Sequence, residues 1–217
     1  MSDGVERHPG IDGDLARRIA HEIRSPLGVI VGGLDEVTGR KDLPPDAVGF
    51  LALARRSAGR LERLVERMEW IAGMQAGDFG DSDQTEPLND VLDRAVREAV
   101  AFAGRRGINV EIDRGDADAR APGGRAVRQI LQELVHNAIR HARTRVDIRL
   151  AIVEGAPQVR IEHDGPALDP ELLVVEKSTQ HASGLGLGLW LCRRLAQHVG
   201  ATLRADATGL TLELPER

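Results

Sequence analysis

The chain is 217 residues long, 41% hydrophobic and 29% charged, with a net charge of -5 at pH 7 and an aromatic content of 2%. This composition is typical of a globular protein of one or two domains, and the negative charge and scarce aromatics argue against nucleic acid as a partner. The longest nearly apolar run, residues 27–34, is far too short to span a bilayer, and no signal peptide is recognisable. We therefore expect no membrane insertion and a cytoplasmic location.

Two N-terminal segments have apolar residues at intervals of three or four, which is typical of long amphipathic helices. The first, residues 15–39, has its apolar stripe at Leu15, Ile19, Ile23, Pro26, Ile30, Leu34 and Val37. After a turn at residues 40–45, the second has its stripe at Val48, Leu51, Ala54, Ala58, Leu61, Val65, Met68 and Ile71. Because one stripe on each of two helices cannot enclose a full core, we expect residues 1–76 to form a helical hairpin that pairs as a homodimer, giving a four-helix bundle.

Residues 77–86 contain the run Gly-Asp-Phe-Gly-Asp-Ser-Asp-Gln and are expected to form a linker. In the remaining part, residues 87–217, segments of helical and strand periodicity alternate. The expected helices are 88–103, 125–142 and a segment from the glycine-rich turn to about 199; the expected strands are 108–112, 146–152, 159–161, 203–205 and 210–214. This order indicates an α/β sandwich with helices on one face of a mixed sheet. The fold class is therefore expected to be α+β, a dimerising helical hairpin followed by an α/β sandwich domain.

A histidine followed directly by a carboxylate, His21 and Glu22, lies midway along the first predicted helix. His21 is two residues from both Ile19 and Ile23, so it is rotated by about 200° from each and is expected to be exposed. Such a histidine can lose its proton and act as a nucleophile. Far downstream, the glycine-rich turn at residues 184–189 precedes a predicted helix and is suited to hold phosphate. Together the motifs indicate phosphate transfer from a nucleotide to His21, although each alone also fits a solvated helix face or an ordinary turn.

The segment His21-Glu22-Ile23-Arg24-Ser25-Pro26-Leu27, together with the glycine-rich turn, resembles the sensor histidine kinases of two-component systems, from about residue 12 to residue 215. The resemblance implies autophosphorylation of His21 from ATP and Mg²⁺, followed by transfer to an aspartate of a response-regulator receiver domain. It implies that Glu22 accepts the proton of one ring nitrogen while the other nitrogen attacks the terminal phosphorus. Ser25, one helical turn from His21, falls where bifunctional members orient the water that removes phosphate from the partner.

The predicted helix at residues 127–141 resembles the N box of this family. Its spacing places Val127, Leu131, Leu134 and Ala138 on a core stripe. The resemblance implies that Asn137 holds Mg²⁺, that Arg140 meets phosphate and that His141 flanks the nucleotide. Glu133 shares the neighbouring face with Asn137 and Arg140. For Glu133 and Arg140, a salt-bridged surface face is the alternative interpretation.

The segment around His163, Asp164 and Gly165 departs from the family pattern D-x-G-x-G. The family's aspartate, which accepts a hydrogen bond from the adenine amino group, is replaced by His163, and the second glycine is replaced by Ala167. A neutral His163 can accept one hydrogen bond but lacks a second oxygen, and strand alternation turns Asp164 to the opposite side unless the backbone bulges. Loss of one such bond costs about 1 to 3 kcal/mol, so nucleotide binding is expected to be weakened or re-tuned.

The region before the glycine-rich turn also departs from the family. Thr179 and Gln180 fall where members with a short ATP lid have a Thr-Thr-Lys type segment, so Gln180 replaces a lysine that would face a phosphate. The family's phenylalanine-rich lid anchor is absent as well. The three glycines of the turn, Gly184, Gly186 and Gly188, are present, and they permit the backbone to approach the phosphates closely.

Three functional hypotheses fit these motifs. The first is a dimeric histidine kinase, and the second is a phosphotransfer or scaffold protein of the same architecture with weak or no ATP binding. The third is an ATPase of the wider gyrase, Hsp90 and MutL group, based on Glu133. Asn137 and the glycines favour the first, whereas His163, Ala167 and Gln180 favour the second. Because only about ten residues precede residue 12, we expect the input signal to come from a separate sensory partner, from the catalytic domain surface or from a region outside this sequence.

Overall fold

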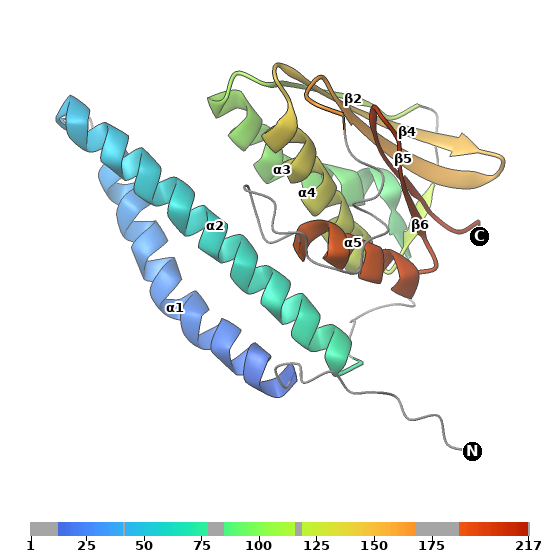
Figure 1. The fold of residues 1–217 in the computed structure, drawn as a ribbon, viewed down its shortest axis with the longest axis horizontal. Helices are drawn as coiled ribbons and strands as arrows, with labels where there is room; N and C mark the ends of the chain where they lie inside the picture. Colours follow the sequence, from blue (N-terminus) through green and yellow to red (C-terminus); the bar gives the residue numbers. More distant parts are fainter. Residues whose placement is uncertain (1–12, 41, 78–84, 116–118, 168–186, 217) are drawn as a thin grey trace. The chain divides into compact units, whose positions relative to one another are not determined.

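The computed structural model describes residues 13–40, 42–77, 85–115, 119–167 and 187–216. The chain divides into two units, Met1–Phe79 and Gly80–Arg217. The first unit contains two long helices, and the second contains the remaining helices and all strands (Figure 1). Within the described residues, every helix is too short or too polar to cross a membrane. The expected fold class, a helical hairpin followed by an α/β sandwich, is confirmed.

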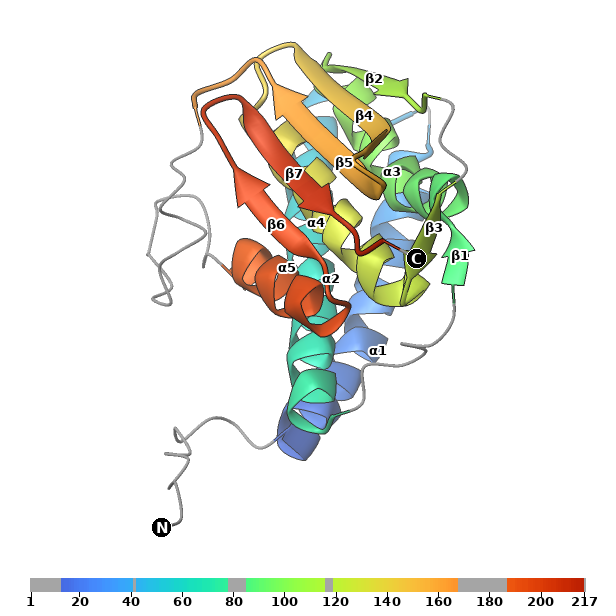
Figure 2. The same cartoon turned by 90° about the vertical axis from the view of Figure 1, so that its right-hand side faces the viewer.

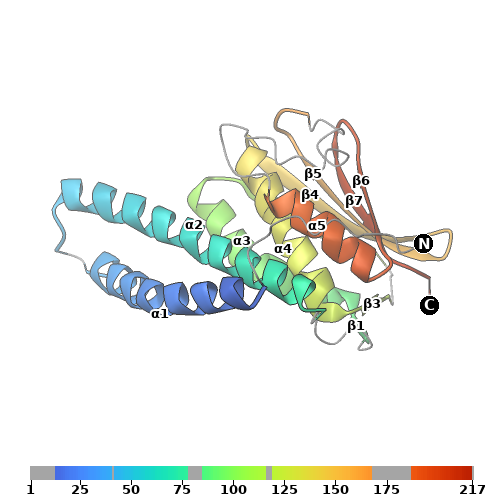
Figure 3. The ribbon, with the colours of Figure 1, turned by 60° about the horizontal axis from the view of Figure 1, so that its bottom comes forward.

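The first unit is an antiparallel hairpin of α1 (Gly13–Thr38) and α2 (Pro45–Gln75), which lie alongside each other over most of their length (Figure 3). Both helices occur where the sequence predicts them. Helix α2 begins with Pro45 at its first position, where a proline loses no hydrogen bond. The negative charge of Asp46, in the first turn, interacts favourably with the positive end of the helix dipole. Helix α1 ends at Thr38, directly before Gly39.

The contact between α1 and α2 uses only part of the predicted apolar stripes. The buried cluster consists of Ala20, Leu27, Ala58 and Val65, with Val31, Leu34 and Met68 packed against it. Ala20 and Leu27 were not on the predicted stripe of the first helix, whereas three residues that were, Leu15, Ile23 and Ile30, are 47%, 40% and 55% exposed. The first helix therefore has two apolar faces, of which one packs within the hairpin and the other does not.

The second unit contains a five-stranded sheet in the order β2-β4-β5-β7-β6, in which β2 and β4 are parallel and the other neighbours are antiparallel. The strands are β2 (Asn109–Asp113), β4 (Arg145–Val153), β5 (Ala156–His163), β6 (Thr202–Ala205) and β7 (Gly209–Glu213). Helices α3 (Leu88–Arg105), α4 (Gly124–His141) and α5 (Leu187–His198) all lie on one face of this sheet (Figure 2). The two C-terminal strands that the sequence predicts pair as a hairpin, with Leu203 opposite Leu212 and Ala205 opposite Leu210.

A two-stranded antiparallel ribbon of β1 (Thr85–Pro87) and β3 (Arg120–Pro122) was not predicted. Strand β1 begins at Thr85, inside the range 77–86 that the sequence analysis assigns to a linker. Each strand is three residues long and contains a proline, so neither has a periodic pattern of its own. The ribbon exists because the chain before α3 meets the chain before α4, and this is a long-range contact.

The core of the second unit lies between the helices and the covered face of the sheet. The predicted stripe of α4 is confirmed, because Val127, Leu131, Leu134 and Ala138 are all buried. Cys192 on α5 is also buried, as expected for a small hydrophobic residue. Alternate residues of the central strands complete the core: Val146, Ile148, Leu150, Val159, Ile161 and Leu212. Each strand therefore presents one apolar face to the helices.

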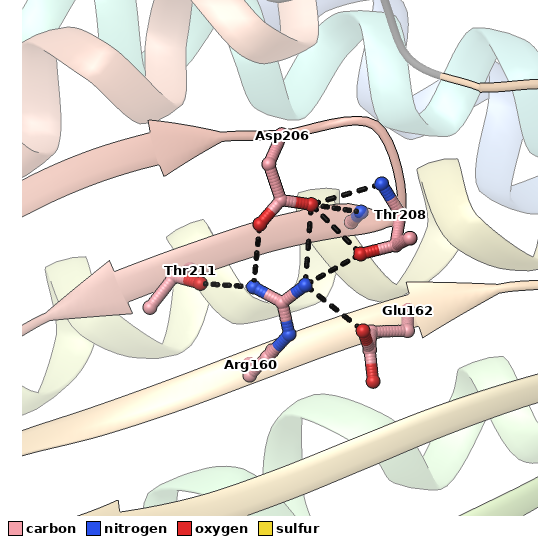
Figure 4. A network of polar contacts seen from close by, with 6 residues as sticks. Arg160, Glu162, Asp206, Thr208 and Thr211 are labelled. Carbon is pink, nitrogen blue, oxygen red and sulfur yellow. Dashed lines mark hydrogen bonds and ion pairs between the residues drawn. The ribbon is translucent and has the colours of Figure 1, made fainter.

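The uncovered face of the sheet carries a polar network centred on Arg160 of β5 (Figure 4). The Arg160 guanidinium pairs with Asp206 at 2.9 Å and with Glu162 at 2.9 Å. Asp206 also accepts hydrogen bonds from the backbone amides of Thr208 and Gly209, and these contacts, led by the bond from Arg160, hold the pKa of Asp206 well below its usual range. The network fastens the β6–β7 turn to the central strand β5.

Candidate functional site

The candidate phosphoacceptor, His21, lies on α1 and is exposed, as the sequence predicts. The preceding residue, Ala20, is fully buried in the contact with α2, so the next position along the helix turns away from that contact. Glu22 and Ser25 are exposed as well. Because Ser25 is one helical turn from His21, the imidazole, the carboxylate and the hydroxyl are available together on an open surface.

One interhelical ion pair lies beside this surface. Nη2 of Arg24 is 2.5 Å from Oε2 of Glu69 on α2, and the arginine side chain is 54% exposed. An ion pair this exposed contributes at most about 1 kcal/mol to stability. It connects the two helices near His21 and contributes little to the stability of the hairpin.

In the second unit, the predicted site residues of α4 follow one another along one side of the helix. Glu133 is 7% exposed, Asn137 is half-buried, and Arg140 is exposed. The Gln129 side-chain amide donates a hydrogen bond to Oε1 of Glu133 at 3.4 Å. Glu133 is therefore buried and does not lie on an exposed surface face. The side-chain oxygens of Glu133 and Asn137, one turn apart, are of the kind that Mg²⁺ prefers, so the residues present fit that ion.

The C-terminal end of α4 is held by Arg106, which the sequence analysis did not single out. Its Nη1 donates to the carbonyl oxygens of Ile139 at 2.7 Å and Arg140 at 3.2 Å, and so satisfies two acceptors that the helix end leaves open. The next residue is His141. Loss of water around its ring, followed by the charges of Arg140, His163 and Arg106, lowers the pKa of His141.

The end of β5 brings His163 close to His141. The two imidazole rings are stacked, with centroids 6.2 Å apart and planes inclined by 28°. Nδ1 of His163 accepts a hydrogen bond from the backbone amide of Gly165 at 3.1 Å. A Cβ atom at Gly165 would overlap the carbonyl oxygen of His141, so only glycine allows the turn after β5 to lie this close to the end of α4.

The Asp164 carboxylate accepts hydrogen bonds from the turn between α4 and β4. Its Oδ1 accepts hydrogen bonds from the backbone amides of Arg143 at 2.8 Å and Arg145 at 3.1 Å. Its Oδ2 accepts from the Thr144 amide at 3.0 Å and from the Thr144 hydroxyl at 2.5 Å. The Thr144 hydroxyl is the largest cause, with the backbone amides, of a pKa for Asp164 well below its usual range. The carboxylate therefore ties the α4–β4 turn to the end of β5.

Some of the predicted site lies outside the described residues. This applies to Thr179, Gln180, Gly184 and Gly186. Gly188, the third glycine, lies in the first turn of α5. The described residues thus bring His141, at the end of α4, close to His163 and Gly165 after β5, whereas His21 belongs to the other unit.

Two family models match separate parts of the chain. The family described as "His Kinase A (phospho-acceptor) domain" matches residues 12–77, and the family described as "Histidine kinase-, DNA gyrase B-, and HSP90-like ATPase" matches residues 123–217. The first match contains His21, and the second contains Asn137, His163 and the glycine-rich turn.

Curated relatives and solved structures agree with these matches. The chain is 28% identical to "Sensor histidine kinase TrcS" of Mycobacterium tuberculosis and 24% identical to "Phosphate regulon sensor protein PhoR" of Pseudomonas aeruginosa, covering 97% and 84% of this chain. It spans only 45% and 44% of the length of those two relatives.

Among solved structures, full-length ShkA in complex with AMPPNP matches 94% of this chain and 46% of its own chain, with a TM-score of 0.64 and 19% identity. Acinetobacter baumannii AdeS matches 91% of this chain and 98% of its own, with a TM-score of 0.60 and 18% identity. These likenesses concern the fold. Residues 12–77 thus match a phosphoacceptor-domain family and residues 123–217 an ATPase-domain family, and these matches together with the curated relatives support a sensor histidine kinase of two-component systems.

Proposed function

We propose that this chain is an autophosphorylating protein-histidine kinase that transfers the terminal phosphoryl group of ATP to His21 and then to an aspartate of a response-regulator receiver domain. The observation that carries this proposal is the exposed His21 on α1, with Glu22 beside it and Ser25 one turn away. The match of residues 12–77 to a phosphoacceptor domain supports it.

In the proposed reaction, one ring nitrogen of His21 attacks the γ-phosphorus in line, a nitrogen–phosphorus bond forms, and the bond to the bridging oxygen breaks to release ADP. Glu22 accepts the proton of the other ring nitrogen, which makes the attacking nitrogen more nucleophilic. Mg²⁺ would neutralise charge on the phosphate oxygens. Asn137 and Glu133 would hold this ion, and Arg140 and the glycine-rich turn would hold the phosphates.

The second apolar face of the hairpin is proposed to pair with a second copy of the chain. Large hydrophobic side chains remain exposed on both helices of the hairpin: Leu15, Ile23, Val29, Ile30, Val48, Phe50, Leu53 and Leu61. Exposed large hydrophobic side chains gathered on one pair of helices are typical of a protein–protein interface. A symmetric homodimer would bury these residues in a four-helix bundle.

A second candidate function is phosphotransfer or dephosphorylation without ATP-dependent autophosphorylation. One observation favours it: His163 replaces the carboxylate of the family pattern, and the neighbouring Asp164 is engaged with the backbone of residues 143–145. In that case His21 would receive its phosphoryl group from another protein, and Ser25 would orient the water for removal of phosphate from the regulator.

The test is incubation of the chain with labelled ATP and Mg²⁺, followed by measurement of acid-labile protein phosphate. We expect His21→Gln to abolish the label without changing thermal stability, because the ring is exposed. Glu22→Gln should lower the initial rate by about a hundredfold or more, the usual size of a general-base contribution. Label on another residue in His21→Gln would refute the assignment. An unlabelled wild type that still accepts phosphate from a phosphorylated receiver domain would favour the second function.

A further inference from the structure

The C-terminal turn of α4 adjoins residues that the proposed kinase reaction uses. Arg140 lies in this turn, and Asn137 precedes Arg140 by three residues. The inference rests on the proposed function, in which Asn137 holds Mg²⁺ and Arg140 meets a phosphate. Helix ends fray when their open carbonyl groups lack partners, and a frayed turn would no longer hold Arg140 in one place. The groups that hold this turn therefore affect how well the nucleotide is bound.

Two carbonyl groups of this turn are left open where the chain leaves α4. In a continued helix, the carbonyls of Ile139 and Arg140 would accept the amides of Arg143 and Thr144. Those two amides donate instead to the Asp164 carboxylate, at 2.8 Å and 3.0 Å. Ile139 is completely buried, so water has no access to its carbonyl oxygen. An unpaired carbonyl at this position would destabilise the turn.

Arg106 supplies the donor that these carbonyls need. Its Nη1 is 2.7 Å from the carbonyl oxygen of Ile139 and 3.2 Å from that of Arg140. A charged donor makes a stronger hydrogen bond than a neutral one. The positive charge of the guanidinium also interacts favourably with the negative end of the α4 dipole. One side chain from outside α4 thus holds the last turn of this helix.

The backbone around Arg106 is fixed by the end of α3. Arg106 is the C-cap residue of α3, and Gly107, which follows it, has a φ of 68°. The amides of Gly107 and Ile108 donate to the carbonyls of Gly104 and Ala103, at 3.1 Å and 3.0 Å, and these two bonds form a Schellman motif. Because the backbone of Arg106 is already ordered in this motif, only its side chain loses conformational freedom when it binds α4.

We propose that Arg106 is a positioning residue of the kinase reaction, which holds the last turn of α4 so that Asn137 and Arg140 meet the metal ion and the phosphates of the bound nucleotide. Arg106 acts through the helix backbone. Its effect is the same before and during phosphoryl transfer, so its loss should raise the KM for ATP and leave the maximal rate nearly unchanged. A general loss of folding would instead lower the amount of active protein, and with it the maximal rate, at an unchanged KM.

The test is the initial rate at which the full chain forms acid-labile phosphate, measured over a range of ATP concentrations with Mg²⁺. Arg106→Met keeps the aliphatic stem and removes the donors, and we expect it to raise the KM for ATP about tenfold. Arg106→Lys retains a charged donor and should return the KM to within about threefold of the wild type. Arg120→Met is the matched control and should keep the wild-type KM. Arg120 also donates to a backbone carbonyl of this unit, that of Thr85 at 2.7 Å, but in the ribbon of β1 and β3.

Three outcomes would overturn the proposal while leaving the kinase function intact. They are a wild-type KM in Arg106→Met, an equal rise of the KM in Arg106→Met and Arg120→Met, and a KM in Arg106→Lys as high as in Arg106→Met. A wild type that forms no acid-labile phosphate would contradict the proposed kinase function, and the positioning role with it.

A measurement without nucleotide tests the geometry alone. In Arg106→Met, the amides of residues 140–142 should exchange hydrogen about tenfold faster than in the wild type, because the last turn of α4 opens more often. In Arg120→Met, exchange at these residues should not change. Unchanged exchange in Arg106→Met would refute the role of Arg106 in holding the turn, whatever the nucleotide measurements show.

Discussion

The two units of this chain solve the burial of apolar surface in different ways. Eight of the eleven large hydrophobic side chains that are exposed among the described residues lie on α1 and α2. In the second unit, three helices and one face of a five-stranded sheet enclose side chains that are completely buried, including Leu92, Leu131 and Leu195. In the hairpin, α1 and α2 pack along one seam, and a further set of large hydrophobic side chains remains exposed.

The two units therefore differ in the amount of apolar surface that stabilises each of them. A helix pair buries one seam, and that seam here contains two alanines, Ala20 and Ala58, which contribute little apolar area. The second unit buries many leucine, isoleucine and valine side chains in a core formed by its own residues. We therefore expect the hairpin to depend on assembly with a second copy and the second unit to fold by itself.

The largest effect is expected from placing a charge on the uncovered face of the hairpin. Ile30→Glu should weaken the dimer roughly a thousandfold or more, because each of two copies would bury an unpaired carboxylate at a cost of about 3 to 5 kcal/mol. Analytical ultracentrifugation over a range of concentrations measures the change. Gly32→Glu is the matched control: Gly32 is exposed, a Cβ atom there meets no other atom, and two residues along the helix rotate it by about 200° from Ile30, so its dimer should persist. Equal behaviour of the two variants, or a monomeric wild type, would remove the proposed asymmetry between the units.

An intermediate effect is expected in the core of the second unit. Leu131→Ala should lower the free energy of unfolding of this unit by about 3 kcal/mol, because Leu131 is fully buried and its truncation leaves a cavity. Ile152→Ala, at a side chain that is 51% exposed, should cost less than about 1 kcal/mol. Chemical denaturation, monitored by a spectroscopic probe in each unit, measures the loss of unfolding free energy for each variant. A loss that appears in the hairpin transition instead would mean that the units do not unfold separately.

The smallest effect is expected from pH. The folded pKa of Asp164 is lower than its unfolded value of about 3.9, so its hydrogen bonds stabilise the second unit fully at neutral pH, and this contribution is lost as the pH falls below about 4. Asp164→Asn should lower the melting temperature at pH 7, and its difference from the wild type should shrink below about pH 4. Thr144→Val, which removes only the hydroxyl donor, should give a smaller change of the same kind. A difference that stays constant across this range would contradict the role given to the charge.

Much of the fold was predictable because the apolar periodicity is strong. The helices of the hairpin, the buried stripe of α4 and the strands β6 and β7 occur close to the expected residues. The exposure of His21 was predictable from its offset from Ile19 and Ile23. The ribbon of β1 and β3 was not, because three-residue strands that contain proline have no periodic pattern and form only when distant segments meet.

The local spacing of side chains along the chain was enough to predict the helices, the strands of the five-stranded sheet, the core stripe of α4 and the exposed position of His21. Three features became evident only from the folded structure. They are the face of α1 that packs within the hairpin, the hydrogen bonds of Asp164 to the α4–β4 turn, and the hydrogen bond that Nδ1 of His163 accepts. The physical reason is that a hydrogen bond and a packing choice depend on which groups come within about 3 to 4 Å of each other after the chain has folded, and linear spacing does not specify those neighbours.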